Sequence, residues 1–180
     1  MSTTLTPVIT DVGLQSVFTA NNAGIQAEIT HILLGDSGYT ADKGARALRN
    51  RRARIAIADG TRITDTQIHL TGLLDGSTEF WVREVGFELS DGTLLAVWSH
   101  ASQALAYKAN GVDLLLAFDL VLAALPAESV TVQGTGQNLN LYLAEELARA
   151  ACAQIRVATC QVNTMHRQIL LNDRLLAIGA

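Results

Sequence analysis

The first apolar residues of the chain recur at the spacing of one helix face. Leu14, Val17 and Phe18 form this stripe. Thr10 or Asp11 can accept hydrogen bonds from the free amides of the first turn. The pattern predicts a short N-terminal helix over Asp11–Phe18.

The apolar runs that follow alternate with polar residues or are rich in β-branched side chains, which favours strands. Asp59-Gly60 and Ser90-Asp91-Gly92 separate neighbouring runs, and both favour tight hairpin turns. The predicted strands are 29–34, 54–58, 61–70, 80–89, 93–99, 112–122 and 128–132. We therefore predict an α+β fold for residues 1–133, a small antiparallel, hairpin-rich domain with one short N-terminal helix.

A long stretch without Gly or Pro follows Gly134 and Gly136. These glycines predict a hinge over residues 134–138, and residues 139–180 are predicted to form an oligomerising helix. Apolar residues recur in two heptad sets: Leu141, Ala148, Ile155, Val162, Ile169 and Leu176, and Ala144, Ala151, Ala158 and Met165, with polar Asn172 as the exception. This 3–4 spacing predicts a coiled-coil seam along a helix of roughly 60 Å. An amphipathic helix folded back on its own sheet is the alternative. The heptad pattern alone does not decide whether two or three helices form the coiled coil.

Near the C-terminus the helix carries more apolar residues than a seam uses. The additional ones are Leu170, Leu171, Leu175 and Ile178. Contiguous exposed apolar surface usually marks a partner site. We predict that residues 167–180 dock a further protein component, with a fold-back onto the bundle as the alternative.

Charge is low and unevenly spread. Of the 180 residues, 17% are charged, the net charge is −4 and 49% are hydrophobic, which favours a folded chain over a disordered one. Seven of the 13 basic residues lie between Lys43 and Arg62, where Asp59 is the single acid. The five central arginines are Arg46, Arg49, Arg51, Arg52 and Arg54. We predict that this basic face binds an acidic protein surface; a solvated loop is the alternative, and nucleic acid is disfavoured because no aromatic residues are interleaved.

Residues with catalytic or metal-binding potential are scattered. Gly35-Asp36-Ser37-Gly38 resembles the tetrapeptide around the nucleophile of chymotrypsin-like proteases. Those enzymes need a His and an Asp far upstream and the Ser near the end of the chain, whereas only His31 and Asp11 precede Ser37 here, so a turn is the interpretation. The four histidines lack metal-ligand spacing, and Cys152 and Cys160 lie too far apart on one helix to pair. Four acids are interpreted as solvent-facing strand residues: Glu84, Glu88, Asp113 and Asp119. We therefore expect no enzyme, metal or cofactor.

No apolar run approaches the length of a membrane span, and the first ten residues lack the features of a signal peptide. We expect no membrane partner and synthesis in a reducing cytoplasm.

Several ordered segments resemble the phage tail-collar fibre family. They are residues 9–14 (ITDVGL), 29–39 (ITHILLGDSGY), 82–87 (VREVGF), 91–97 (DGTLLAV) and the apolar strand 113–122, and the resemblance spans about residues 5–133. The family implies the N-terminal domain of a tail fibre of contractile-tailed phages, which attaches to the baseplate, trimerises and leads into a shaft with a receptor-binding tip. It implies no active site and no cofactor.

Members of this family usually continue for hundreds of residues, whereas this sequence ends at Ala180. We therefore expect a proximal tail fibre or adaptor that takes part in host adsorption by joining the baseplate to a separate distal fibre protein. The resemblance places it in the virion tail, assembled in the host bacterial cytoplasm. A small oligomeric, hydrolase-like cytoplasmic enzyme and an unrelated interaction module are the alternatives.

Overall fold

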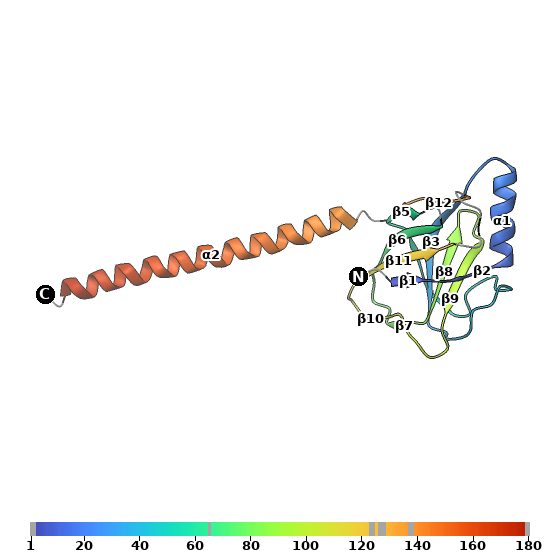
Figure 1. Ribbon diagram of the computed structural model, residues 1–180. Coiled ribbons are helices and arrows are strands. Elements are labelled where there is room, and N and C mark those ends of the chain that lie inside the picture. Colours follow the sequence, from blue (N-terminus) through green and yellow to red (C-terminus); the bar gives the residue numbers. More distant parts are fainter. Residues whose placement is uncertain (1–2, 65, 123–124, 126–128, 137–138, 179–180) are drawn as a thin grey trace. The chain divides into compact units, whose positions relative to one another are not determined.

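The computed structural model describes residues 3–64, 66–122, 125, 129–136 and 139–178 (Figure 1). The chain divides into two compact units, Met1–Leu139 and Asn140–Ala180. The first unit combines a short helix with many strands, and the second is one long helix. The predicted α+β class is confirmed, while the coiled-coil pairing of the long helix stays a prediction.

Helix α1 (Asp11–Asn22) begins where the sequence places it and runs one turn further than expected. The Oγ1 of Thr10 accepts a hydrogen bond from the amide of Gly13 at 2.9 Å and donates to the carbonyl of Leu94. Gly13 permits close packing, because a Cβ there would lie 2.5 Å from the Cα of Leu95. The cap thus fixes both the start of α1 and its contact with the sheet.

A four-stranded sheet lies in the order β1-β11-β6-β5. Its strands are β1 (Thr3–Leu5), β11 (Leu114–Val121), β6 (Gln67–Leu74) and β5 (Asp59–Thr64). β6 buries every second residue, as its apolar alternation predicts. β11 pairs antiparallel with β6 and parallel with β1, so the predicted central strand at 112–122 is confirmed.

The second sheet has the order β12-β3-β8-β9-β2, and β4 also pairs with β3. Its strands are β2 (Val8–Ile9), β3 (Ala27–Gly35), β4 (Arg51–Ala56), β8 (Glu84–Leu89), β9 (Leu94–Ser99) and β12 (Val130–Val132). The predicted β8–β9 hairpin is confirmed, with Gly92 at φ +83 in its turn. Two further strands, β7 (Phe80–Val82) and β10 (Ala106–Lys108), pair beside the sheets.

The main core contains apolar side chains from both sheets. Ile32 of β3 and Phe87 of β8 belong to one cluster with Leu70 of β6 and Phe118 of β11. The rings of Phe87 and Phe118 meet edge to face, with centroids 6.2 Å apart. A smaller cluster lies apart from this core and contains Leu33, Leu48, Leu94 and Val97. Leu48 belongs to the loop 36–50, so this second cluster holds the loop on the sheet.

The predicted hairpin at Asp59-Gly60 is wrong. β4 pairs with β3, whereas β5 pairs with β6, so the chain passes from one sheet to the other between Ala56 and Asp59. β5 and β6 pair with each other instead, with Thr64 opposite Gln67, within the segment predicted as one strand. Gly60 serves close packing, because a Cβ there would lie 2.3 Å from Val132 Cγ1.

Helix α2 (Leu139–Ile178) is 40 residues long. Its side chains are described at 144 and from 147 to 178, and all of these are exposed, including Cys152 and Cys160. Within the described part of the chain, neither helix is long and apolar enough to cross a membrane.

Candidate functional site

The predicted basic face lies on the loop 36–50 and on the strand that follows it. Arg46 and Arg49 belong to the loop, and Arg51, Arg52 and Arg54 belong to β4. All five are exposed, but they differ in what they contact.

A buried carboxylate anchors the arginine-bearing loop. Glu84, predicted to face solvent, is 0% exposed. Its Oε2 accepts hydrogen bonds from the Tyr39 hydroxyl at 2.8 Å and the Arg49 amide at 3.0 Å. Its Oε1 accepts from the Asn50 amide at 2.8 Å. Since buried carboxylates require such donors, Glu84 fixes both ends of the loop to β8.

Tyr39 connects the buried Glu84 carboxylate to the exposed Arg49 side chain. Burial, the hydrogen bond to Glu84 and the charge of Glu84 together raise the pKa of the Tyr39 phenol, and the opposing effect of Arg49 is smaller. The Arg49 guanidinium lies over the Tyr39 ring, 4.0 Å from its centroid. Arg49 therefore covers the anchor of its own loop through a cation–π contact.

Arg54 is also used within the fold. Its Nε donates to Glu88 Oε1 at 3.0 Å, and Glu88 is 6% exposed rather than solvent-facing as predicted. His31 Nδ1 lies 3.2 Å from Arg54 Nη2. Burial and the charge of Arg54 lower the pKa of His31, and the charge of Glu88 partly offsets them. Arg54, Glu88 and His31 thus join β4, β8 and β3 across the sheet.

The other arginines remain available to a partner. Arg52 Nε lies 3.7 Å from Asp36 Oδ2, with the guanidinium 5.9 Å from the Phe80 ring centroid. Arg46 and Arg51 have no ion pair or ring contact among the described residues. The arginines left to bind an anionic partner are Arg46, Arg51 and Arg52, the last of which lies near Asp36. The candidate partner-binding set is therefore reduced from five arginines to these three.

Sequence reasoning missed Glu84 for a physical reason. In β8, Glu84, Gly86 and Glu88 alternate with apolar residues, which is the pattern of a strand with one face toward solvent. The loop 36–50 covers this face, and a Cβ on Gly86 would lie 3.1 Å from Leu48 Cδ2. An irregular covering loop leaves no periodic signal, so the local sequence could not reveal the burial. Asp119 is likewise buried and lies 2.6 Å from His69 Nδ1, whereas Asp113 is exposed as predicted.

The predicted seam residues of α2 are exposed in the single chain. Ile155, Val162 and Ile169 are 64%, 66% and 58% exposed, and Ala148 is exposed as well. The side chain of Leu141 lies outside the described residues. Because all these positions belong to one continuous helix, they share one stripe along it.

The predicted distal joint is exposed too. Its four residues, Leu170, Leu171, Leu175 and Ile178, are 47%, 59%, 68% and 83% exposed. A single chain therefore presents large apolar side chains to water at both predicted contact regions of α2.

The candidate catalytic and metal-binding residues are not brought together in the described part of the chain. The His31 ring contacts Thr30 and Arg54, and the carbonyl of Ser37 accepts a hydrogen bond from the Ser99 hydroxyl. The described residues contain no group of three or more His, Cys, Asp or Glu that could hold a metal ion.

Comparison with known proteins identifies the class. The family model described as phage tail-collar fibre protein, N-terminal, matches residues 1–164. No curated protein and no solved structure matches the chain. Family membership indicates a structural protein of the virion tail that assembles with other tail proteins, and it speaks against an enzyme. The chain belongs to the phage tail-collar fibre family, and the match extends beyond the predicted residues 5–133 into α2.

Proposed function

We propose that this chain anchors a tail fibre to the phage baseplate, trimerises through α2 and carries a separate distal receptor-binding fibre. The observation that carries the proposal is the heptad-spaced stripe of large apolar residues that α2 exposes along its length. Burying a side chain such as Ile155 or Val162 in a shared seam contributes roughly 1.5–3 kcal/mol. Three helices that bury these stripes against one another would remove this apolar surface from water.

The arginine-bearing loop is proposed as the baseplate contact. Arg46, Arg51 and Arg52 lie on a segment that Glu84 holds in place, which reduces the entropy lost when a partner binds. Replacing Arg46 and Arg51 by Glu should prevent incorporation into particles and leave the soluble oligomer intact. Normal incorporation of this variant would return the loop to the role of a solvated surface.

The distal end of α2 is proposed as the joint to the next fibre component. Leu170, Leu171, Leu175 and Ile178 add apolar surface that a seam of two positions in seven does not use. Deleting residues 170–180 should leave an oligomer that joins the baseplate but does not recruit the distal fibre. Particles that keep their distal fibres after this deletion would exclude the joint.

The seam itself is tested by Ile155→Asp with Val162→Asp, which should convert the trimer to monomers in light scattering. The matched control is Ala153→Asp with Cys160→Asp, two exposed positions with the same seven-residue separation on another face of the helix. The control should keep the parent's mass. Equal behaviour of the two double variants would contradict the seam.

A further inference from the structure

The arginines of α2 form a line along the helix. Arg156, Arg167 and Arg174 are separated by 11 and 7 residues, which places them within about 20° of one another around the helix axis. Arg149 continues the line toward the start of the helix and has an interaction of its own. The three arginines span roughly 27 Å along the axis.

This arginine line faces away from the predicted seam. Around the helix axis, Ile155, Val162 and Ile169 lie about 100–160° from these arginines. Arg156, Arg167 and Arg174 make no ion pair among the described residues, and Asp173, the one acid among the side chains described from 147 to 178, lies on a different face. The line is thus open to a partner both in a monomer and in an oligomer built on the seam.

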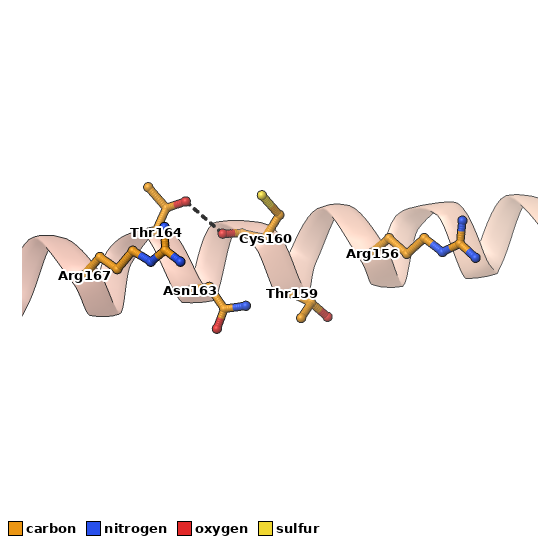
Figure 2. Close-up of a pocket in the computed structure, with 6 residues that line it drawn as sticks. All are labelled: Arg156, Thr159, Cys160, Asn163, Thr164 and Arg167. Atoms are coloured by element: carbon orange, nitrogen blue, oxygen red, sulfur yellow. Dashed lines mark hydrogen bonds between the residues drawn. The ribbon is translucent and has the colours of Figure 1, made fainter.

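Two hollows lie between the arginines. The first, of about 340 Å³, has Arg156 and Arg167 at its ends and small polar side chains such as Thr159 and Asn163 between them (Figure 2). The Thr164 hydroxyl donates a hydrogen bond to the Cys160 carbonyl at 2.9 Å, so it points back toward the helix backbone. The second, of about 260 Å³, is lined by Arg167, Leu170, Leu171 and Arg174.

The chemistry of the two hollows defines the occupant. Three cations in line call for an extended anion, and two leucines between Arg167 and Arg174 call for apolar groups next to carboxylates. A nucleic acid would leave the leucines uncovered and finds no aromatic side chain among the hollow-lining residues. A membrane surface would find apolar residues at one end of the line alone.

We propose that the arginine line of α2 binds an acidic, leucine-bearing helix of a protein partner, with the partner's carboxylates on Arg156, Arg167 and Arg174 and its apolar side chains on Leu170 and Leu171. This goes beyond the proposed distal joint, on which it rests for Leu170 and Leu171 alone. The partner helix lies along the outside of α2, where it leaves the seam undisturbed.

The probe is a labelled synthetic helix of about 20 residues, long enough to span the line, with leucines flanked by glutamates at seven-residue spacing. Fluorescence anisotropy with the full chain should show binding that weakens with salt. Replacing Arg156, Arg167 and Arg174 by Gln should weaken it by about tenfold or more. The matched control replaces Gln154, Gln161 and Gln168 by Glu, the same change of −3 in charge on another face, and should weaken it far less.

Leu170→Ser with Leu171→Ser should weaken binding of the synthetic helix and leave binding of poly-glutamate unchanged. A scrambled peptide of the same composition that binds equally well would overturn the proposal, as would tighter binding of a thymidine oligonucleotide or of phosphatidylserine vesicles. The mass of the chain is measured in the same samples. A monomeric parent that binds the peptide would contradict the trimer and support the arginine line, whereas a trimer that does not bind it would do the reverse.

Discussion

The two units of this chain differ in how deeply their side chains are buried. In the first unit, charged side chains such as Glu84, Glu88 and Lys108 are buried and find their partners inside the same fold. In α2, every described side chain is exposed, including large apolar ones such as Ile155 and Ile169. The first unit has a buried core and also exposes apolar side chains such as Ile25, Val112 and Leu115, whereas none of the described side chains of α2 is buried. One chain thus combines a unit that has its own buried core with a helix whose apolar stripe we propose is covered by other copies of the chain.

The largest expected effect concerns the anchor of the arginine-bearing loop. Glu84→Ala should lower the free energy of unfolding of the first unit by about 3 kcal/mol or more, because three buried donors lose their acceptor. Chemical denaturation measures the change. Glu79→Ala, which removes an exposed glutamate, should cost less than about 0.5 kcal/mol. Equal losses in the two variants would show that the anchor does not stabilise the fold.

Charge reversal should separate two arginines that are three residues apart. Arg54→Glu places a carboxylate beside buried Glu88 and should cost about 2 kcal/mol. Arg51→Glu removes no described contact and should stay within about 0.5 kcal/mol of the parent. A substantial loss in Arg51→Glu would mean that the basic face is part of the fold rather than open to a partner.

The pH dependence of stability should report on Tyr39. Because the pKa of Tyr39 is raised above its ordinary value of 10.0, the unfolded chain loses this proton first as pH rises, and stability falls above about pH 10. Tyr39→Phe lacks this proton. The stability difference between parent and variant should therefore shrink as pH rises above about 10 in urea unfolding. A constant difference would contradict the hydrogen bond between Tyr39 and Glu84.

The smallest expected effect is the removal of α2. Gln133 donates to the Ile29 carbonyl, and Thr135 and Gly136 donate to the Ile57 carbonyl, so the strand contacts of the first unit continue through residue 136. Residues 1–136 alone should have a free energy of unfolding within about 0.5 kcal/mol of the parent. Residues 1–132, which lack these bonds, should lose about 1–3 kcal/mol. An unfolded circular dichroism spectrum for residues 1–136 would show that α2 stabilises the first unit.

The sequence predicted what local patterns determine. The Thr10 cap and the turn at Gly92 each depend on residues close together in the chain, and each was found as expected. The pairing of β4 was not predictable in this way, because Asp59-Gly60 suits a hairpin turn and also suits packing against Val132. Distance in the sequence, rather than weak propensity, limited the prediction.

The candidate site shows the same division. The basic residues were visible in the sequence as a charge cluster. The sequence did not show which of them contact the rest of the fold, because Arg49 and Arg54 are bound by Tyr39 and Glu88, which are not their neighbours in the sequence. The apolar stripe of α2 was fully readable, since a single helix places every seventh residue on one face. Its coiled-coil pairing, the predicted hinge at 134–138 and the partner contacts stay predictions.

The central claim is that α2 buries its exposed apolar stripe against the α2 helices of other copies of the chain. Multi-angle light scattering of the parent chain over a range of concentrations tests it most directly. The account predicts a mass three times the 19.2 kDa of one chain, falling toward that of one chain in Ile155→Asp with Val162→Asp. A parent chain that remains at 19.2 kDa throughout would contradict it.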